Sequence, residues 1–139
     1  MLRSCGGPKG PYLPFAPPIT PNTWFCLDGH LYFGESFPQL VFCREWLEVG
    51  DGEIYSVALS GDLTHMVDEP IRLFAASEAS WTRPIDDSQT KYITDGPFLW
   101  KSRATHELLM LWSSIGENGA YNVRYTTLRV FKLFRLTYL

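Results

Sequence analysis

Residues 27–32 read LDGHLY, and a similar stretch at residues 94–100 reads TDGPFLW, with the two aspartates 67 positions apart (95 minus 28). In each stretch an Asp-Gly step leads into an apolar run, and a second apolar run follows at residues 40–43 and at residues 108–112. Self-similarity at a fixed spacing is typical of proteins that stack equivalent structural units. We therefore expect the two aspartates to occupy equivalent places in two such units.

Short apolar runs separated by turn residues follow each Asp-Gly step. Gly and Asp residues, such as those at 50–52, separate the runs, and an Asp-Gly pair between apolar runs is a hairpin signal. The runs predict strands at residues 31–33, 39–44, 53–59 and 71–75 in the first unit and at 97–101, 107–113 and 121–127 in the second. Four short antiparallel strands joined by tight turns form a sheet of the size of one β-propeller blade. The sequence therefore predicts an all-β chain, a β-propeller fragment of about two four-stranded antiparallel blades.

Proline divides the chain into an arm and a domain. Six of the ten prolines lie in residues 1–23, at positions 8, 11, 14, 17, 18 and 21. Because proline lacks a backbone donor and has a fixed φ, we expect an extended arm without a regular ladder or helix. The domain is expected over residues 24–139, with one blade at 24–75, an irregular connection at 76–93 and a second blade at 94–139. The apolar run at 129–139 is the candidate fourth strand of the second blade.

Composition and charge exclude several classes of partner. The chain has 139 residues, 45% of them hydrophobic, and a formal net charge of −3. This composition suits one globular domain with a packed core, and it gives no basic surface for nucleic acid. The sequence shows no signal-peptide pattern and no run of 18 apolar residues, so we expect no membrane partner. It does not encode a cellular compartment.

The sequence contains no pattern for a metal ion or cofactor. The three cysteines show no CxxC spacing, and the three histidines stand far apart along the chain. Phosphate-binding loops, dinucleotide fingerprints and the serine nucleophile elbow are also missing. We therefore expect reduced thiols, no metal ion and no cofactor.

Asp28 and Asp95 are the first candidates for chemistry. The first strand of each propeller blade lines the central channel, so carboxylates just ahead of two first strands should face one mouth of that channel. Two carboxylates that flank a glycosidic bond, one donating a proton and one acting on water, are the minimum for glycoside hydrolysis. The alternative is plain turn chemistry, because Asp caps turns and Gly supplies a positive φ. The repetition of the step favours the catalytic interpretation.

Six stretches of the sequence carry a combined resemblance to a known family. They are residues 24–32, 41–46, 52–63, 77–81, 94–100 and 109–114. Taken together they resemble glycoside hydrolase family 43, or its close relatives in the same clan of propeller glycosidases. The resemblance extends from about residue 10 to residue 125 and implies that the two blades belong to a five-bladed β-propeller.

The resemblance also implies a reaction and a set of acidic residues. The reaction is inverting hydrolysis of arabinose-, xylose- or galactose-containing glycans, so the implied partner is an oligo- or polysaccharide substrate. Members use a general base Asp in the first blade, an orienting and pKa-tuning Asp in the second, and a general acid in the third. Asp28 matches the second of these and Asp95 the third, where the family more often has Glu. Because Asp is shorter and would retract the proton donor, Glu78 is an alternative acid, with Glu45 ranked behind it.

The general base of the family has no counterpart in this chain, and the tail after residue 127 no longer resembles the family. An inverting mechanism needs both an acid and a base. We therefore expect a truncated fragment that lacks the general base and is inactive, or nearly so, on its own. A non-catalytic carbohydrate-binding module and a remnant without function are the two alternatives. Relatives are often secreted or periplasmic.

Substrate contacts are expected from two tryptophans and one histidine. Trp46 and Trp81 lie in or beside irregular segments, unlike the tryptophans within strands, and are candidate platforms for sugar rings. His30 follows Asp28 by two residues and is the third candidate. For each of them the simpler interpretation is a core aromatic or a histidine with ordinary hydrogen-bond partners.

Overall fold

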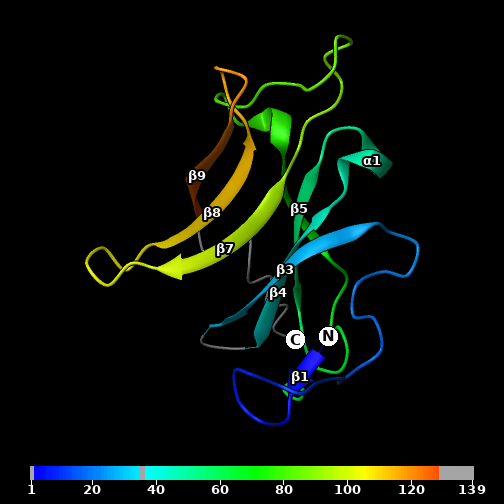
Figure 1. Cartoon of the computed structure of the whole chain (residues 1–139). Coiled ribbons are helices and arrows are strands. Elements are labelled where there is room, and N and C mark those ends of the chain that lie inside the picture. The colour runs from blue at the N-terminus through cyan, green and yellow to red at the C-terminus, as the bar shows by residue number, and fades with distance from the viewer. Residues whose placement is uncertain (1, 35–36, 129–139) are drawn as a thin grey trace, which may run out of the picture.

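The computed structural model describes residues 2–34 and 37–128, which form antiparallel strands, the loops between them and two short helical segments (Figure 1). In chain order the elements are β1 (Leu2–Ser4), β2 (Tyr12–Pro14), β3 (Cys26–Phe33), β4 (Pro38–Arg44), α1 (Trp46–Val49), β5 (Glu53–Ala58), β6 (Ile71–Ala75), the 3-10 helix η1 (Ala76–Glu78), β7 (Asp95–Lys101), β8 (Leu108–Ile115) and β9 (Tyr121–Leu128). The predicted all-β class is confirmed. Within the described residues, no helix has the length and apolar character needed to cross a membrane.

Two sheets make up the body of the molecule. One is four-stranded, in the order β3-β4-β5-β6, and the other is three-stranded, in the order β7-β8-β9. Both are antiparallel, and each strand pairs with the next one along the chain, as short loops require. All seven predicted strands are present. The candidate strand at 129–139 lies outside the described residues.

Two details of the strand prediction are wrong. β3 begins at Cys26 and β7 at Asp95, so the Asp-Gly steps lie inside these strands and not ahead of them. The proline-rich arm also contains a ladder, because β1 and β2 pair from Leu2 opposite Pro14 to Ser4 opposite Tyr12. Prolines 8 and 11 lie in the loop of this hairpin, and Pro14 ends its second strand, where proline is tolerated.

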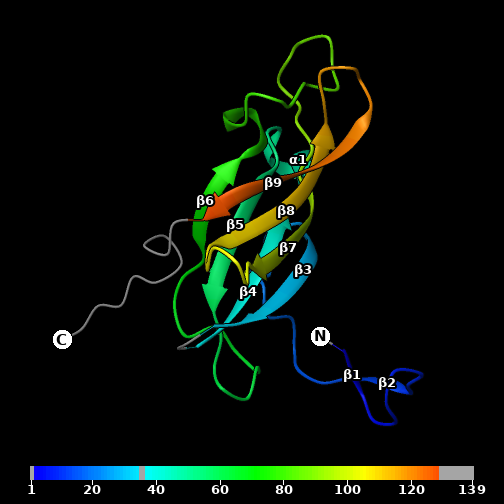
Figure 2. The ribbon, with the colours of Figure 1, turned by 90° about the vertical axis from the view of Figure 1, so that its left-hand side faces the viewer.

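The two sheets pack on each other through one face of each (Figure 2). Val41, Cys43 and Ile54 of the first sheet and Met110 and Trp112 of the second are fully buried in this core. Alternation along each strand places these side chains on the inner faces. Burial of apolar surface is the dominant favourable term in folding, so this core fixes the two sheets against each other.

The arm covers the other face of the first sheet. Leu40, Phe42 and Val57 point away from the second sheet and pack with Ile19, while Trp24 lies against the same cluster. The guanidinium of Arg44 lies 4.2 Å from the centroid of the Trp24 ring, and the Trp24 and Tyr55 ring centroids are 4.7 Å apart. The segment before β3 is therefore part of the packed structure.

The second sheet has an outer face with several large apolar side chains that are more than a third exposed in the described structure. Phe98, Leu111 and Tyr125 stand opposite one another in the register of β7, β8 and β9. These side chains are 49%, 36% and 68% exposed, and Trp100 and Val123 beside them are 48% and 62% exposed. We call these five residues the outer apolar face.

A candidate acidic site where the two sheets meet

Both Asp-Gly steps form β-bulges at the start of the first strand of their sheet. In β3 the pairing with β4 shifts between Leu27 and His30, and in β7 the pairing with β8 shifts between Asp95 and Phe98. Each bulge inserts one extra residue and sharpens the local twist. The Asp-Gly pair in each repeat therefore shapes the backbone where β3 and β7 lie side by side.

The two bulges do not align aspartate with aspartate. The left-handed residue is Asp28 in β3, with φ of 54°, and Gly96 in β7, with φ of 56°. Leu27 and Asp95 are the last paired residues before each bulge, so Asp28 corresponds to Gly96, an offset of 68 (96 minus 28). The expectation that the two aspartates occupy equivalent places is wrong by one residue. The reason is that the equivalent backbone position is the left-handed residue of each bulge, which is Asp28 in β3 and Gly96 in β7. Gly adopts this conformation routinely and Asp does so occasionally.

The structure nevertheless brings the two aspartates together. Asp28 Oδ2 accepts a hydrogen bond of 2.9 Å from the backbone N–H of Gly96, the residue after Asp95. Asp95 Oδ2 accepts a hydrogen bond of 2.7 Å from the hydroxyl of Tyr121 in β9. Partial burial of the phenol and this bond to Asp95 raise the pKa of Tyr121 to about 12. Tyr121 was not predicted, because only the β8–β9 register brings it to Asp95.

Glu45 is the third carboxyl group at this place. It follows β4 directly and is 7% exposed, and its Oε1 atom has no hydrogen-bond partner in the described structure. Burial first, and then the negative charges of Asp95 and Asp28, raise the pKa of Glu45. Cys43 lies two residues before Glu45 and on the same side of the first sheet. Burial is the main reason that the pKa of the Cys43 thiol is raised, and the negative charges of Asp28, Asp95 and Glu45 add to this effect.

His30 also lies at the candidate site. Its ring centroid is 4.5 Å from that of Phe98, so the residues that follow the two bulges pack against each other across the sheets. Partial burial lowers the pKa of His30, and a hydrogen bond to the backbone of Leu99 opposes this shift. One ring nitrogen of the neutral imidazole is engaged by the Leu99 backbone, which leaves the other nitrogen for contact with a hydroxyl group.

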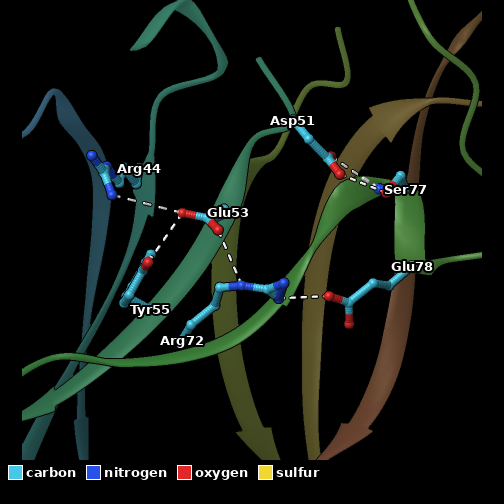
Figure 3. Close-up of polar contacts among 7 residues, drawn as sticks. All are labelled: Arg44, Asp51, Glu53, Tyr55, Arg72, Ser77 and Glu78. Carbon is cyan, nitrogen blue, oxygen red and sulfur yellow. Dashed lines mark hydrogen bonds and ion pairs between the residues drawn. The ribbon is translucent and has the colours of Figure 1, made fainter. Parts of the chain in front are cut away.

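Glu78 belongs to a different group of charges (Figure 3). Its carboxylate pairs with Arg72 at 2.5 Å, and Arg72 also pairs with Glu53 at 3.0 Å. Arg72 lies on β6, which is the edge of the first sheet opposite to β3 and Asp28. The structure therefore does not bring Glu78 to the two aspartates.

The two candidate sugar platforms have different surroundings. The Trp81 ring centroid lies 4.8 Å from that of Trp112, and the guanidinium of Arg124 lies 5.5 Å from the Trp81 ring, so Trp81 packs against the core. Trp46 is half-buried and opens α1 directly after Glu45. Trp46 is thus the candidate platform that directly follows Glu45 in the sequence. Across residues 2–34 and 37–128, no three His, Cys, Asp or Glu side chains gather in a way that could hold a metal ion.

The bond between Tyr121 and Asp95 gives a testable pH dependence. An ordinary tyrosine is half-ionised near about pH 10, so the Tyr121 phenol should remain protonated at about pH 11, where NMR of ring-labelled tyrosine reports its state. Asp95→Asn removes a negative charge and should bring the pKa of Tyr121 down towards the ordinary value. Tyr121→Phe should remove the tyrosine signal that ionises at high pH. A Tyr121 signal that already ionises at the ordinary pH in the unaltered chain would contradict the pairing.

Comparison with known proteins gives the class of the fold. No family model matches the sequence, and no curated protein matches it. A solved structure does match, with a probability of 1.00 and a TM-score of 0.85, and it is that of a glycosidase. The chain therefore has a glycoside hydrolase-like fold.

That structure is the endo-arabinase from Bacteroides thetaiotaomicron VPI-5482. The two sequences are 42% identical, and the match covers 95% of this chain and 48% of the endo-arabinase chain. This chain thus spans about half the length of the protein that it matches. The predicted relationship to glycosidases is confirmed at the level of the fold.

Proposed function

We propose that this chain supplies two neighbouring blades of a five-bladed propeller glycosidase of family 43, and that the assembled enzyme hydrolyses arabinan with inversion. The observation that carries the proposal is the meeting of Asp28 and Asp95 at two β-bulges between the sheets. The likeness to an endo-arabinase supports the same conclusion. An acidic site of this kind also disfavours polyanionic glycans, because carboxylates repel them and accept hydrogen bonds from neutral hydroxyl groups.

The proposed roles follow the chemistry of inversion. One carboxylic acid protonates the leaving oxygen, and one carboxylate activates a water on the opposite side of the sugar, about 6.5 to 9.5 Å away. Asp28 orients the sugar through its free oxygen while Oδ2 is held by Gly96 N–H. Asp95 occupies the family position of the acid. The general base is a carboxylate outside the two sheets described, so the chain by itself binds arabinan and cleaves it slowly or not at all.

Affinity electrophoresis tests this function with the chain as it is. We expect retardation in gels that contain linear arabinan, and less or none in gels that contain xylan or galactan. Asp28→Asn and Asp95→Asn should each weaken the retardation by about tenfold, the scale of one lost charged hydrogen bond. Glu78→Gln is the matched control, because its ion pair with Arg72 lies at the opposite edge of the first sheet.

The same experiment separates the alternatives. A chain that migrates without retardation in all three gels would contradict the proposal. That result would favour the interpretation that the chain is a remnant without function. Retention in arabinan that neither aspartate substitution alters would place binding elsewhere on the surface. Incubation with dye-linked arabinan then distinguishes the module that only binds from one that also cleaves.

A further inference from the structure

The backbone at Glu45 is held in place by hydrogen bonds on both sides. Its N–H donates to the Phe25 carbonyl at 2.8 Å, and its own carbonyl accepts from the N–H groups of Glu48 and Val49 at 3.0 and 3.1 Å. Residues two apart on an extended strand share a face, so Glu45 shares the face of Cys43 that meets the second sheet. The carboxyl group is therefore built into the seam between the sheets.

One oxygen of this carboxyl group is buried without a partner. The side chain is 7% exposed, and Oε1 accepts and donates no hydrogen bond in the described structure. An unpaired buried polar atom destabilises the folded state, and it does so more strongly when it is charged. Folded proteins rarely retain such an atom unless a ligand, a water or a reaction uses it.

The groups that face Glu45 favour its neutral form. They are the carboxylates of Asp28 on β3 and Asp95 on β7, the thiol of Cys43 and, through Asp95, the phenol of Tyr121. None of them supplies a positive charge. The neighbouring cation points away from this site, because Arg44 pairs with Glu48 at 2.6 Å and stacks on Trp24.

We propose that Glu45 is the proton-bearing carboxyl group of the acidic site and donates its proton to the glycosidic oxygen of the bound glycan. This inference rests on the proposed function and deepens it. Among three neighbouring carboxyl groups, the proton stays on the one where a charge is least stable, which is the buried Glu45 beside two aspartates. Asp95, one methylene shorter, already accepts the Tyr121 hydroxyl and serves as a charged neighbour.

The step balances in protons and bonds. The O–H bond of Glu45 breaks as the proton passes to the glycosidic oxygen, and the bond from that oxygen to the anomeric carbon breaks with it. Water adds to the anomeric carbon, and its proton passes to the carboxylate base outside the two sheets. Glu45 is left as a carboxylate and recovers its proton from solvent before the next turnover.

The test measures binding and protonation on the full 139-residue chain. Linear arabino-oligosaccharide is titrated into the protein by calorimetry over a range of pH, and the Glu45 carboxyl carbon is followed by NMR through its own backbone assignment. Only the protonated acid donates to the sugar oxygen, so affinity should be constant below the Glu45 pKa and fall about tenfold per pH unit above it. The carboxyl signal should titrate at a higher pH than an ordinary glutamate.

Variants separate a proton donor from a merely buried side chain. Glu45→Gln keeps a donor but cannot ionise, so binding should become independent of pH over the same range. Glu78→Gln should keep the slope of the unaltered chain. A Glu45 signal that titrates like an ordinary glutamate, or a Glu45→Gln chain that keeps the pH slope, would overturn the inference. Absence of binding at every pH would overturn the proposed function instead, and the NMR titration would still report whether Glu45 holds the proton.

Discussion

Trp112→Ala lowers the free energy of unfolding by about 4 kcal/mol, the usual cost of deleting a fully buried tryptophan. The Trp112 side chain has no exposed surface, and its ring centroid lies 5.0 Å from that of Phe74 and 4.8 Å from that of Trp81. Its indole Nε1–H also donates to the Thr126 hydroxyl at 3.1 Å. The substitution therefore removes packing between the sheets and one hydrogen bond, and urea unfolding followed by circular dichroism measures the loss.

Trp100→Ala is the matched control for this prediction. Trp100 lies in the neighbouring strand of the same sheet, but on the outer apolar face, where it is 48% exposed. We expect a loss below about 1 kcal/mol, as for other surface substitutions. A Trp112→Ala chain no less stable than the Trp100→Ala chain would mean that the core between the sheets does not hold them together.

Gly52→Ala is the second change with a large expected effect. A Cβ atom at this position would lie 2.7 Å from Thr94 Oγ1, 2.9 Å from the Tyr92 carbonyl and 3.0 Å from Thr94 N. Two of these neighbours are backbone atoms, and Gly52 N–H donates to the Tyr92 carbonyl at 2.9 Å, so neither side can withdraw without breaking a bond. We expect a loss of about 2 kcal/mol, within the range for overpacked sites.

The same substitution should also weaken arabinan binding, because Thr94 precedes Asp95 and moves with it. Gly61→Ala is the matched control, since a Cβ atom there meets nothing within 4 Å. It should change the free energy of unfolding by less than about 0.5 kcal/mol and leave retardation in arabinan gels unchanged. Equal effects of the two alanines would show that the contact between residues 52 and 94 does not position the site.

The sequence predicts the strands well because short apolar runs and Gly-Asp turns are local signals. It does not predict where β3 and β7 begin, since a bulge interrupts the alternation on which the prediction depends. The one-residue offset between the repeats has the same cause. Asp28 and Gly96 share the left-handed backbone conformation. Because both stretches contain the same Asp-Gly pair, the sequence alone does not show that the left-handed residue is the Asp in one and the Gly in the other.

The candidate site is predicted in part. Asp28 and Asp95 can be predicted because each lies beside a glycine in a repeated stretch. For the alternative acid, the sequence favours Glu78 over Glu45, whereas the structure places Glu45 at the two aspartates. The signal for Glu45 is its place in the alternation Val41, Cys43, Glu45, where a charged residue continues a buried face. That signal gains meaning only when the second sheet is known to cover this face.

The arm and the outer apolar face leave the far sides of the two sheets unequally covered. The first sheet is covered on its far side by Ile19 of the arm and by Trp24, while the second sheet leaves Phe98, Trp100 and Tyr125 exposed to water. A further sheet would thus bury more apolar surface by joining the β7–β9 side than the arm side.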